Sequence, residues 1–340
     1  MDEWLTFMIG IEPDILSKQL NEVSAAFHNR YLEEGRSDYI TRQLGTLRWD
    51  REISQNVMEA TNQSLAELGI DLDIWNSITQ TVTDIAPEIG PAFYYFIQSI
   101  PQFKNEYPEL AQSEIWQNIR KGKSCFLLMR LEANHPEGFR ASFHEAGHAI
   151  ETFLMLNMGK STAETGFSQN GRPMSLNEIF SLFHESRMPQ EDFFKDRERF
   201  LTARFAGLTL HELNIWHIAE AFTRGEIELE DFLKKIEDSY QNTFGEGVNS
   251  DVPSGRSLSD FFTPYNPLFA CGYVYGMVGA TALMKYLESG SDDGKSRIEA
   301  LREIASISLT SETIEEILSA MNYSWQAGTA AMHDYFGLKK

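Results

Sequence analysis

The stretch FHEAGHAIE at residues 143–151 combines a metal-binding pattern with the periodicity of an α-helix. Residues four positions apart in a helix lie on the same face, so His144 and His148 can direct their imidazoles at one zinc ion. Glu145 follows His144 directly and points about a quarter-turn away, which suits a general base acting on water better than a metal ligand. We therefore expect a zinc site with a carboxylate base beside it.

The residues around this motif support a helical assignment. Phe143, Ile150, Phe153 and Leu154 recur at helical spacing and are expected to form an apolar stripe that faces the core. Gly147 lies inside the same predicted helix, where glycine costs up to about 1 kcal/mol relative to alanine. A glycine at this position suggests that another part of the chain packs closely against that turn.

A catalytic zinc of this kind takes three protein ligands and leaves the fourth position for water. The segment PMSLNEIFSLFHE at residues 173–185 predicts a second helix, on which Glu178, Ser181 and Glu185 share one face. One of the two carboxylates could bind the metal while the other orients a ligand imidazole. We expect Glu178 to be the ligand, because it follows His148 at a distance that allows a loop and a returning antiparallel helix. The competing candidates are Glu151, Glu164, His184 and Glu185.

These motifs resemble those of the thimet oligopeptidase and oligoendopeptidase F family of zinc peptidases. FHEAGHAIE is similar to the family's F-H-E-x-G-H, and NEIFSLFHE to its E-x-x-S-x-x-x-E helix. The resemblance covers about residues 120–340. It implies that His144, His148 and Glu178 bind one zinc ion, that Glu145 is the general base, and that the protein is an α-helical peptidase acting on short peptides.

The stretch YNPLFACGYVYGMVGATALMKYLES at residues 265–289 resembles the tyrosine-bearing segment of the same family. The family has a histidine just before these tyrosines, whereas this sequence has none between His217 and His333. By this resemblance the phenol of Tyr273 or Tyr275 is expected to stabilise the oxyanion that forms during hydrolysis.

The chain as a whole is expected to be mainly α-helical. Its arrangement is expected to be zincin-like, with the zinc ion between two helices. A short strand near residues 123–132 could form a small sheet beside the motif helix. We expect an N-terminal helical cap over residues 1–120 and a catalytic region over residues 121–340. Other predicted helical segments are 11–34, 52–68, 73–85 and 91–119.

Composition restricts the class of partner. The 340 residues carry a formal net charge of −21 and include two cysteines. Such a charge repels phosphate backbones and anionic membranes, so neither nucleic acid nor a membrane is an expected partner. The N-terminal sequence has no basic region followed by a long apolar stretch, and the few cysteines fit a reducing compartment, so we expect a cytoplasmic protein.

Two other functions remain open at this stage. A zinc carboxypeptidase of the thermostable type carries its third ligand in an H-E-S string, and His184-Glu185-Ser186 would then make Glu185 the ligand. The second alternative is not an enzyme: it is a helical peptide-binding protein with a vestigial metal site. The expected substrates of the main hypothesis are short peptides, and the sequence does not indicate the oligomeric state.

Overall fold

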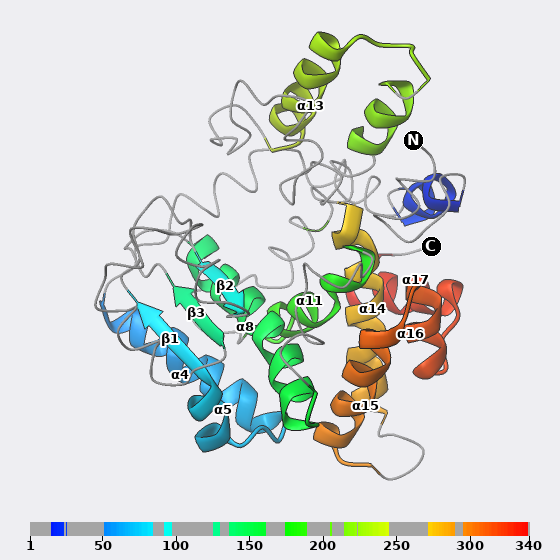
Figure 1. Cartoon of the computed structure of the whole chain (residues 1–340). Helices are drawn as coiled ribbons and strands as arrows, with labels where there is room; N and C mark the ends of the chain where they lie inside the picture. Colours follow the sequence, from blue (N-terminus) through cyan, green and yellow to red (C-terminus); the bar gives the residue numbers. More distant parts are fainter. Residues whose placement is uncertain are drawn as a thin grey trace.

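The computed structural model is mainly helical, with one small sheet (Figure 1). This arrangement agrees with the fold class expected from the sequence. The residues that the structure describes are 15–23, 25, 51–83, 92–96, 125–129, 136–160, 174–188, 205, 214–222, 224–244, 271–289 and 295–338.

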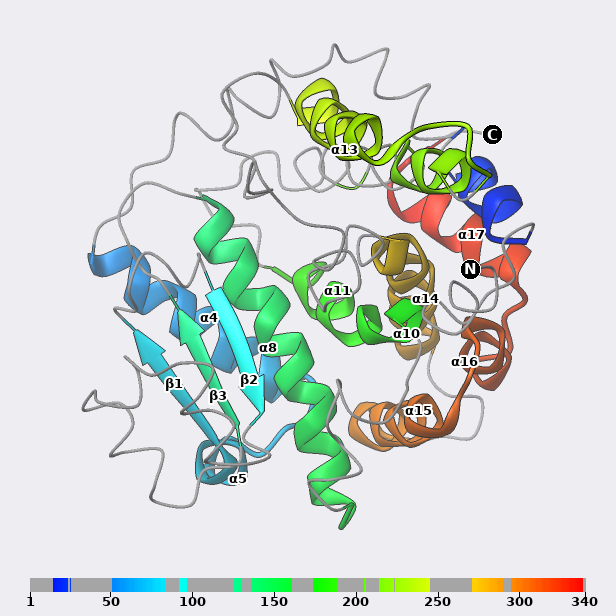
Figure 2. The ribbon, with the colours of Figure 1, turned by 45° about the horizontal axis from the view of Figure 1, so that its top comes forward.

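The motif helix is α8, Pro136–Asn157, and it lies between the sheet and the helices that follow it in sequence (Figure 2). The proline is suited to the first turn of a helix, because its missing N–H would have no partner there in any case. The predicted apolar stripe is buried as expected. Its members, each at most 1% exposed, are Phe143, Ile150, Phe153 and Leu154.

The second predicted helix is present but interrupted at one residue. It consists of α10, Met174–Asn177, and α11, Ile179–Glu185, with Glu178 between them. The backbone angles of Glu178 are φ −94° and ψ 2°, which lie in the bridge region rather than the α region. The helical direction is nevertheless kept, because the amide of Leu182 donates to the carbonyl of Glu178 at 3.0 Å. The apolar side chains of this segment are buried at Leu176, Ile179, Phe180 and Phe183.

The sheet has the strand order β1-β3-β2 and packs beside α8 (Figure 2). Its strands are β1, Thr79–Thr83, β2, Ala92–Phe96, and β3, Cys125–Met129. β3 pairs in parallel with β1 and antiparallel with β2. The strand expected near residues 123–132 is therefore confirmed.

Two helical predictions are wrong in part. Helix α4, Arg51–Glu67, matches the prediction, but α5, Leu72–Ile78, ends where β1 begins instead of continuing to residue 85. Thr79–Thr83 is rich in β-branched residues, which favour strands. Residues 92–96, four of which are aromatic, likewise form β2 within a segment that was expected to be helical.

The C-terminal helices pack around α14, Cys271–Glu288 (Figure 1). This helix contacts α10 and α11 as well as α16, Ile314–Ala320, and α17, Trp325–Tyr335. The remaining long helices are α13, Leu229–Phe244, and α15, Arg297–Thr310; α15 contacts α8.

The N-terminal helical residues 15–23 are tied to the C-terminal half by one buried side chain. The hydroxyl of Tyr275 donates to Oε1 of Gln19 at 2.8 Å, and Nε2 of Gln19 donates to Glu315 at 3.2 Å. The sheet also takes strands from both sides of residue 120, so the two halves of the chain are packed together. The division into a cap and a catalytic region stays a prediction.

None of the helices within the described ranges combines the length and the apolar composition that crossing a membrane requires.

Candidate metal centre

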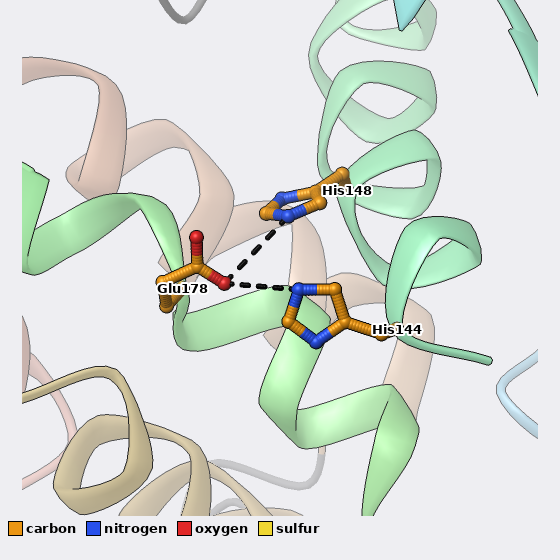
Figure 3. Close-up of side chains that lie close together, drawn as sticks. All are labelled: His144, His148 and Glu178. Carbon is orange, nitrogen blue, oxygen red and sulfur yellow. Dashed lines mark ion pairs between the residues drawn. The ribbon is translucent and has the colours of Figure 1, made fainter. Parts of the chain in front are cut away.

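Three predicted ligands from two neighbouring helical segments meet at one point (Figure 3). Oε2 of Glu178 lies 3.1 Å from Nε2 of His144 and 3.7 Å from Nε2 of His148. The ligand atoms of these three residues all lie within 4.8 Å of one another. The spacing of four residues on α8 places the two imidazoles one turn apart, and the junction of α10 and α11 places the carboxylate opposite them.

The dimensions of this cluster fit a zinc ion. Donor atoms about 2.0–2.1 Å from a tetrahedral ion lie about 3.3–3.4 Å from one another. The two distances to Oε2 of Glu178, 3.1 and 3.7 Å, bracket that value. Two imidazoles and one carboxylate are also a ligand set found in catalytic zinc sites, which keep a fourth position open.

Glu185 lies on the other side of the His144 ring. Its Oε2 is 2.9 Å from Nδ1 of His144, and the Glu185 side chain is fully buried. When Nδ1 carries the proton it donates to this carboxylate, so the lone pair of Nε2 is directed toward Glu178 and His148. Glu185 thus contacts the nitrogen of His144 that is turned away from the cluster.

The other competing ligands are engaged elsewhere or lie outside the described residues. Oε1 of Glu151 accepts a hydrogen bond from Ser308 at 2.9 Å. Nδ1 of His184 donates to the carbonyl oxygen of Phe143 at 2.8 Å, and the two rings are stacked. Glu164 falls outside the described part of the chain.

Ser181 holds the carboxylate of Glu178 from its own helix. The Ser181 hydroxyl lies 2.7 Å from Oε2 of Glu178 and 3.0 Å from the carbonyl oxygen of the same residue. Both side chains are almost completely buried, at 0% and 2% exposure. A buried hydroxyl at this distance restricts the rotation of the carboxylate.

Charges around the cluster favour a bound cation. Burial by itself would lower the pKa of His144, but hydrogen bonds and negative charge from Glu178 and Glu185 outweigh it and raise that pKa to about 9. Burial would raise the pKa of Glu178, yet the charge of His148 and contacts with His144 and Ser181 lower it to about 2. In the metal-free protein a proton on His144 therefore neutralises part of the buried negative charge, as a metal ion would.

The two candidate tyrosines lie in different surroundings on α14. The ring of Tyr273 is partly buried, and its centroid lies 5.9 Å from that of His144. Tyr275 is fully buried, packs against Trp325, and donates its hydroxyl to Gln19. Only Tyr273 is thus brought beside the cluster, while the Tyr275 hydroxyl is used in the core. Glu145 lies on α8 between the two histidines in sequence and is partly exposed.

The second helix makes two close backbone contacts, of which sequence reasoning anticipated the one at Gly147 and missed the one at Gly276. A Cβ added to Gly147 would lie 2.3 Å from the carbonyl oxygen of Phe180, and one added to Gly276 would lie 2.5 Å from Cβ of Glu178. The first contact explains why glycine is present in the motif helix, as its position suggested. Gly276 gave no comparable signal, because glycines occur at several places along α14 and no local pattern distinguishes this one.

Comparisons with known proteins give a likeness of fold. No protein-family model and no curated protein matches the sequence. Among solved structures, the fold is similar to the crystal structure of M32 carboxypeptidase from Deinococcus radiodurans R1, with a TM-score of 0.59 and 13% sequence identity. The match covers 99% of this chain and 70% of that chain. It confirms the mainly helical fold, whereas the thimet oligopeptidase family in particular is not shown.

Proposed function

We propose that the protein is a zinc-dependent peptidase that hydrolyses peptide bonds in short peptides. The observation that carries the proposal is the position of Glu178 Oε2, 3.1 Å and 3.7 Å from the Nε2 atoms of His144 and His148. These three side chains would hold one zinc ion. When bound there, zinc would lower the pKa of water toward about 7 and polarise the scissile carbonyl.

The other residues of the site would then have separate roles. Glu145 would accept a proton from the attacking water and pass it to the leaving amine, a task for a carboxylate next to the ligands and accessible to substrate. The Tyr273 hydroxyl would donate to the oxygen of the carbonyl under attack. Glu185 would hold His144 in the orientation and tautomer in which Nε2 can bind metal.

The direct test is metal analysis of the purified protein together with digestion of a peptide mixture, with and without a chelator. The proposal expects about one zinc per chain, cleavage of the peptides, and loss of cleavage after zinc is removed. Recovery of cleavage when zinc is added back completes the expected result. Cleavage that continues unchanged in metal-free protein would overturn it.

A zinc carboxypeptidase is the second candidate, and it is supported by the likeness of fold to a protein described as an M32 carboxypeptidase. This candidate no longer needs Glu185 as a ligand, because specificity for a peptide terminus depends on how the substrate is held and not on the ligand set. Peptides with an amidated C-terminus separate the two activities. An endopeptidase cleaves them at internal bonds, whereas a carboxypeptidase needs the free carboxylate.

A peptide-binding protein without catalysis is the outcome in which zinc-loaded protein binds peptides but does not cleave them. Under our proposal the partners are peptides, with neither nucleic acid nor a membrane involved, and the protein acts in the cytoplasm. The acidic composition, with a net charge of −21, favours basic or zwitterionic peptides over acidic ones.

A further inference from the structure

The third proposed ligand is in direct contact with a glycine of α14. A Cβ built on Gly276 would lie 2.5 Å from Cβ of Glu178, 2.9 Å from its carbonyl carbon and 3.1 Å from its Cα. Non-bonded carbon atoms ordinarily lie about 3.5–4.0 Å apart. The backbone of α14 therefore rests against the ligand residue itself, and a side chain of any size at position 276 would require the two segments to separate.

The segment that carries Glu178 is confined on its other side as well. A Cβ on Gly147 of α8 would lie 2.3 Å from the carbonyl oxygen of Phe180 and 2.5 Å from Cα of Ser181. Figure 2 shows α11 between α8 and α14, in agreement with its contacts with both helices. The start of α11 thus lies in close contact with two glycine-containing helices. If a side chain on α14 displaced it, it could not move closer to α8 without a steric clash.

We infer that Gly276 is a positioning residue for the metal centre: by lacking a side chain, it lets the backbone of α14 fix Glu178 at the correct distance from His144 and His148. The inference rests on the proposed function. A methyl group at position 276 needs a displacement of about 1 Å to reach an ordinary contact distance. Metal–ligand distances tolerate only about 0.2 Å. A displacement of Glu178 by about 1 Å therefore exceeds the tolerated variation in metal–ligand distance and should weaken metal binding.

Two other glycines provide matched controls, because each is also crowded, with a nearest atom at 2.9 Å instead of 2.5 Å, but by side chains alone. A Cβ on Gly279, one turn further along α14, would lie 2.9 Å from Cγ1 of Ile179 and 3.1 Å from Cδ1 of Ile314. A Cβ on Gly328 of α17 would lie 2.9 Å from Cγ1 of Val278. The obstructing atoms at these two positions belong to side chains, so alanine there presses on side chains and not directly on the backbone of Glu178.

The experiment compares Gly276→Ala, Gly279→Ala and Gly328→Ala with the wild-type protein. Zinc affinity is measured by competition with a chromophoric chelator, thermal unfolding is measured in metal-free protein, and the visible spectrum is recorded after loading with Co²⁺. We expect Gly276→Ala to bind zinc about tenfold or more weakly and to show an altered cobalt spectrum. The two controls are expected to keep affinity within about twofold and to keep the wild-type spectrum.

The inference is overturned if Gly276→Ala binds zinc as tightly as Gly279→Ala and gives the wild-type cobalt spectrum, since α14 would then have moved away without disturbing Glu178. If Gly276→Ala does not fold in dilute buffer, the same titrations are made in trimethylamine N-oxide, which favours the folded state. Wild-type protein that binds no metal would be a failure of the proposed function, and it is distinguished by the first measurement alone.

Discussion

Nδ1 of His144 lies 2.9 Å from Oε2 of Glu185, while Nε2 of the same ring lies 3.1 Å from Oε2 of Glu178. One imidazole thus joins two carboxylates of one helical segment. The two glutamates are seven residues apart, about two helical turns, so both project from the same face of α10 and α11 toward α8. Glu178 and Glu185 are alike in residue type and burial, but each contacts a different nitrogen of the His144 ring.

Glu185→Gln should weaken zinc binding about 10- to 100-fold and leave the fold intact. The amide keeps the size of the side chain but removes the charge that holds the Nδ1 proton of His144. Competition with a chromophoric chelator measures the affinity. Glu230→Gln, an exposed change on α13, is the matched control and should have no effect. Equal zinc affinity in the two variants would contradict a supporting role for Glu185.

Glu145→Gln should retain the full complement of zinc but lose peptide hydrolysis by a factor of about 10² to 10⁴. The amide cannot accept the proton of the attacking water, whereas the ligands His144, His148 and Glu178 are unchanged. Metal analysis and the cleavage rate of a quenched-fluorescent peptide are measured on the same sample. His148→Ala is the comparison, since it should lose both zinc and activity. A Glu145→Gln enzyme with wild-type turnover would exclude this residue as the base.

Tyr273→Phe and Tyr275→Phe should have opposite consequences. The first removes the hydroxyl of a tyrosine whose ring lies beside that of His144, and we expect kcat to fall about 10²- to 10³-fold with little change in unfolding free energy. The second leaves Oε1 of Gln19 without its buried donor and should cost about 1–3 kcal/mol of stability, with kcat nearly unchanged. Urea unfolding and steady-state kinetics distinguish the two. A fall in kcat confined to Tyr275→Phe would reverse the assignment.

His184 predicts a pH dependence of stability. Burial lowers its pKa to about 4, against about 6.5 in the unfolded chain, so the unfolded state takes up the proton first as the pH falls. Stability from this group is complete above pH 6.5 and is lost progressively down to about pH 4. A shift of this size corresponds to a loss on the order of 3 kcal/mol.

Urea unfolding of wild-type protein and of His184→Asn between pH 4 and pH 7.5 checks this expectation. Asparagine can still donate to the carbonyl of Phe143 but does not titrate in this range. The difference in unfolding free energy between the two proteins should therefore change with pH even if the variant is less stable throughout. A difference that stays constant across the range would show that His184 does not carry the effect.

The metal cluster could be anticipated from sequence because its geometry is local. A spacing of four residues places His144 and His148 on one face, and the 173–185 pattern places Glu178 and Glu185 on another. The sequence alone did not determine which of the two glutamates contacts which ring nitrogen of His144. That detail depends on the register between α8 and α11, which is fixed by non-local contacts such as the close approach of Gly147 to Phe180.

Other features depend on contacts between distant parts of the chain. Residues 79–83 continue a helical pattern although most of them are β-branched, and their state depends on pairing with Cys125–Met129, more than forty residues later. The hydroxyl of Tyr275 reaches Gln19 across 256 positions of the chain. The contact between Gly276 and Glu178 likewise requires knowledge of how α14 crosses α10 and α11.

The side chain of Gln19 also affects how the chain can be divided into fragments. Its amide uses both ends, accepting from Tyr275 and donating to Glu315, while Leu16, Leu20 and Val23 beside it are completely buried. A fragment that starts at residue 121 would carry every proposed ligand yet expose the apolar surface that these three residues cover. Residues 15–23 therefore belong to the structural framework of the part of the chain that carries the His144, His148 and Glu178 cluster.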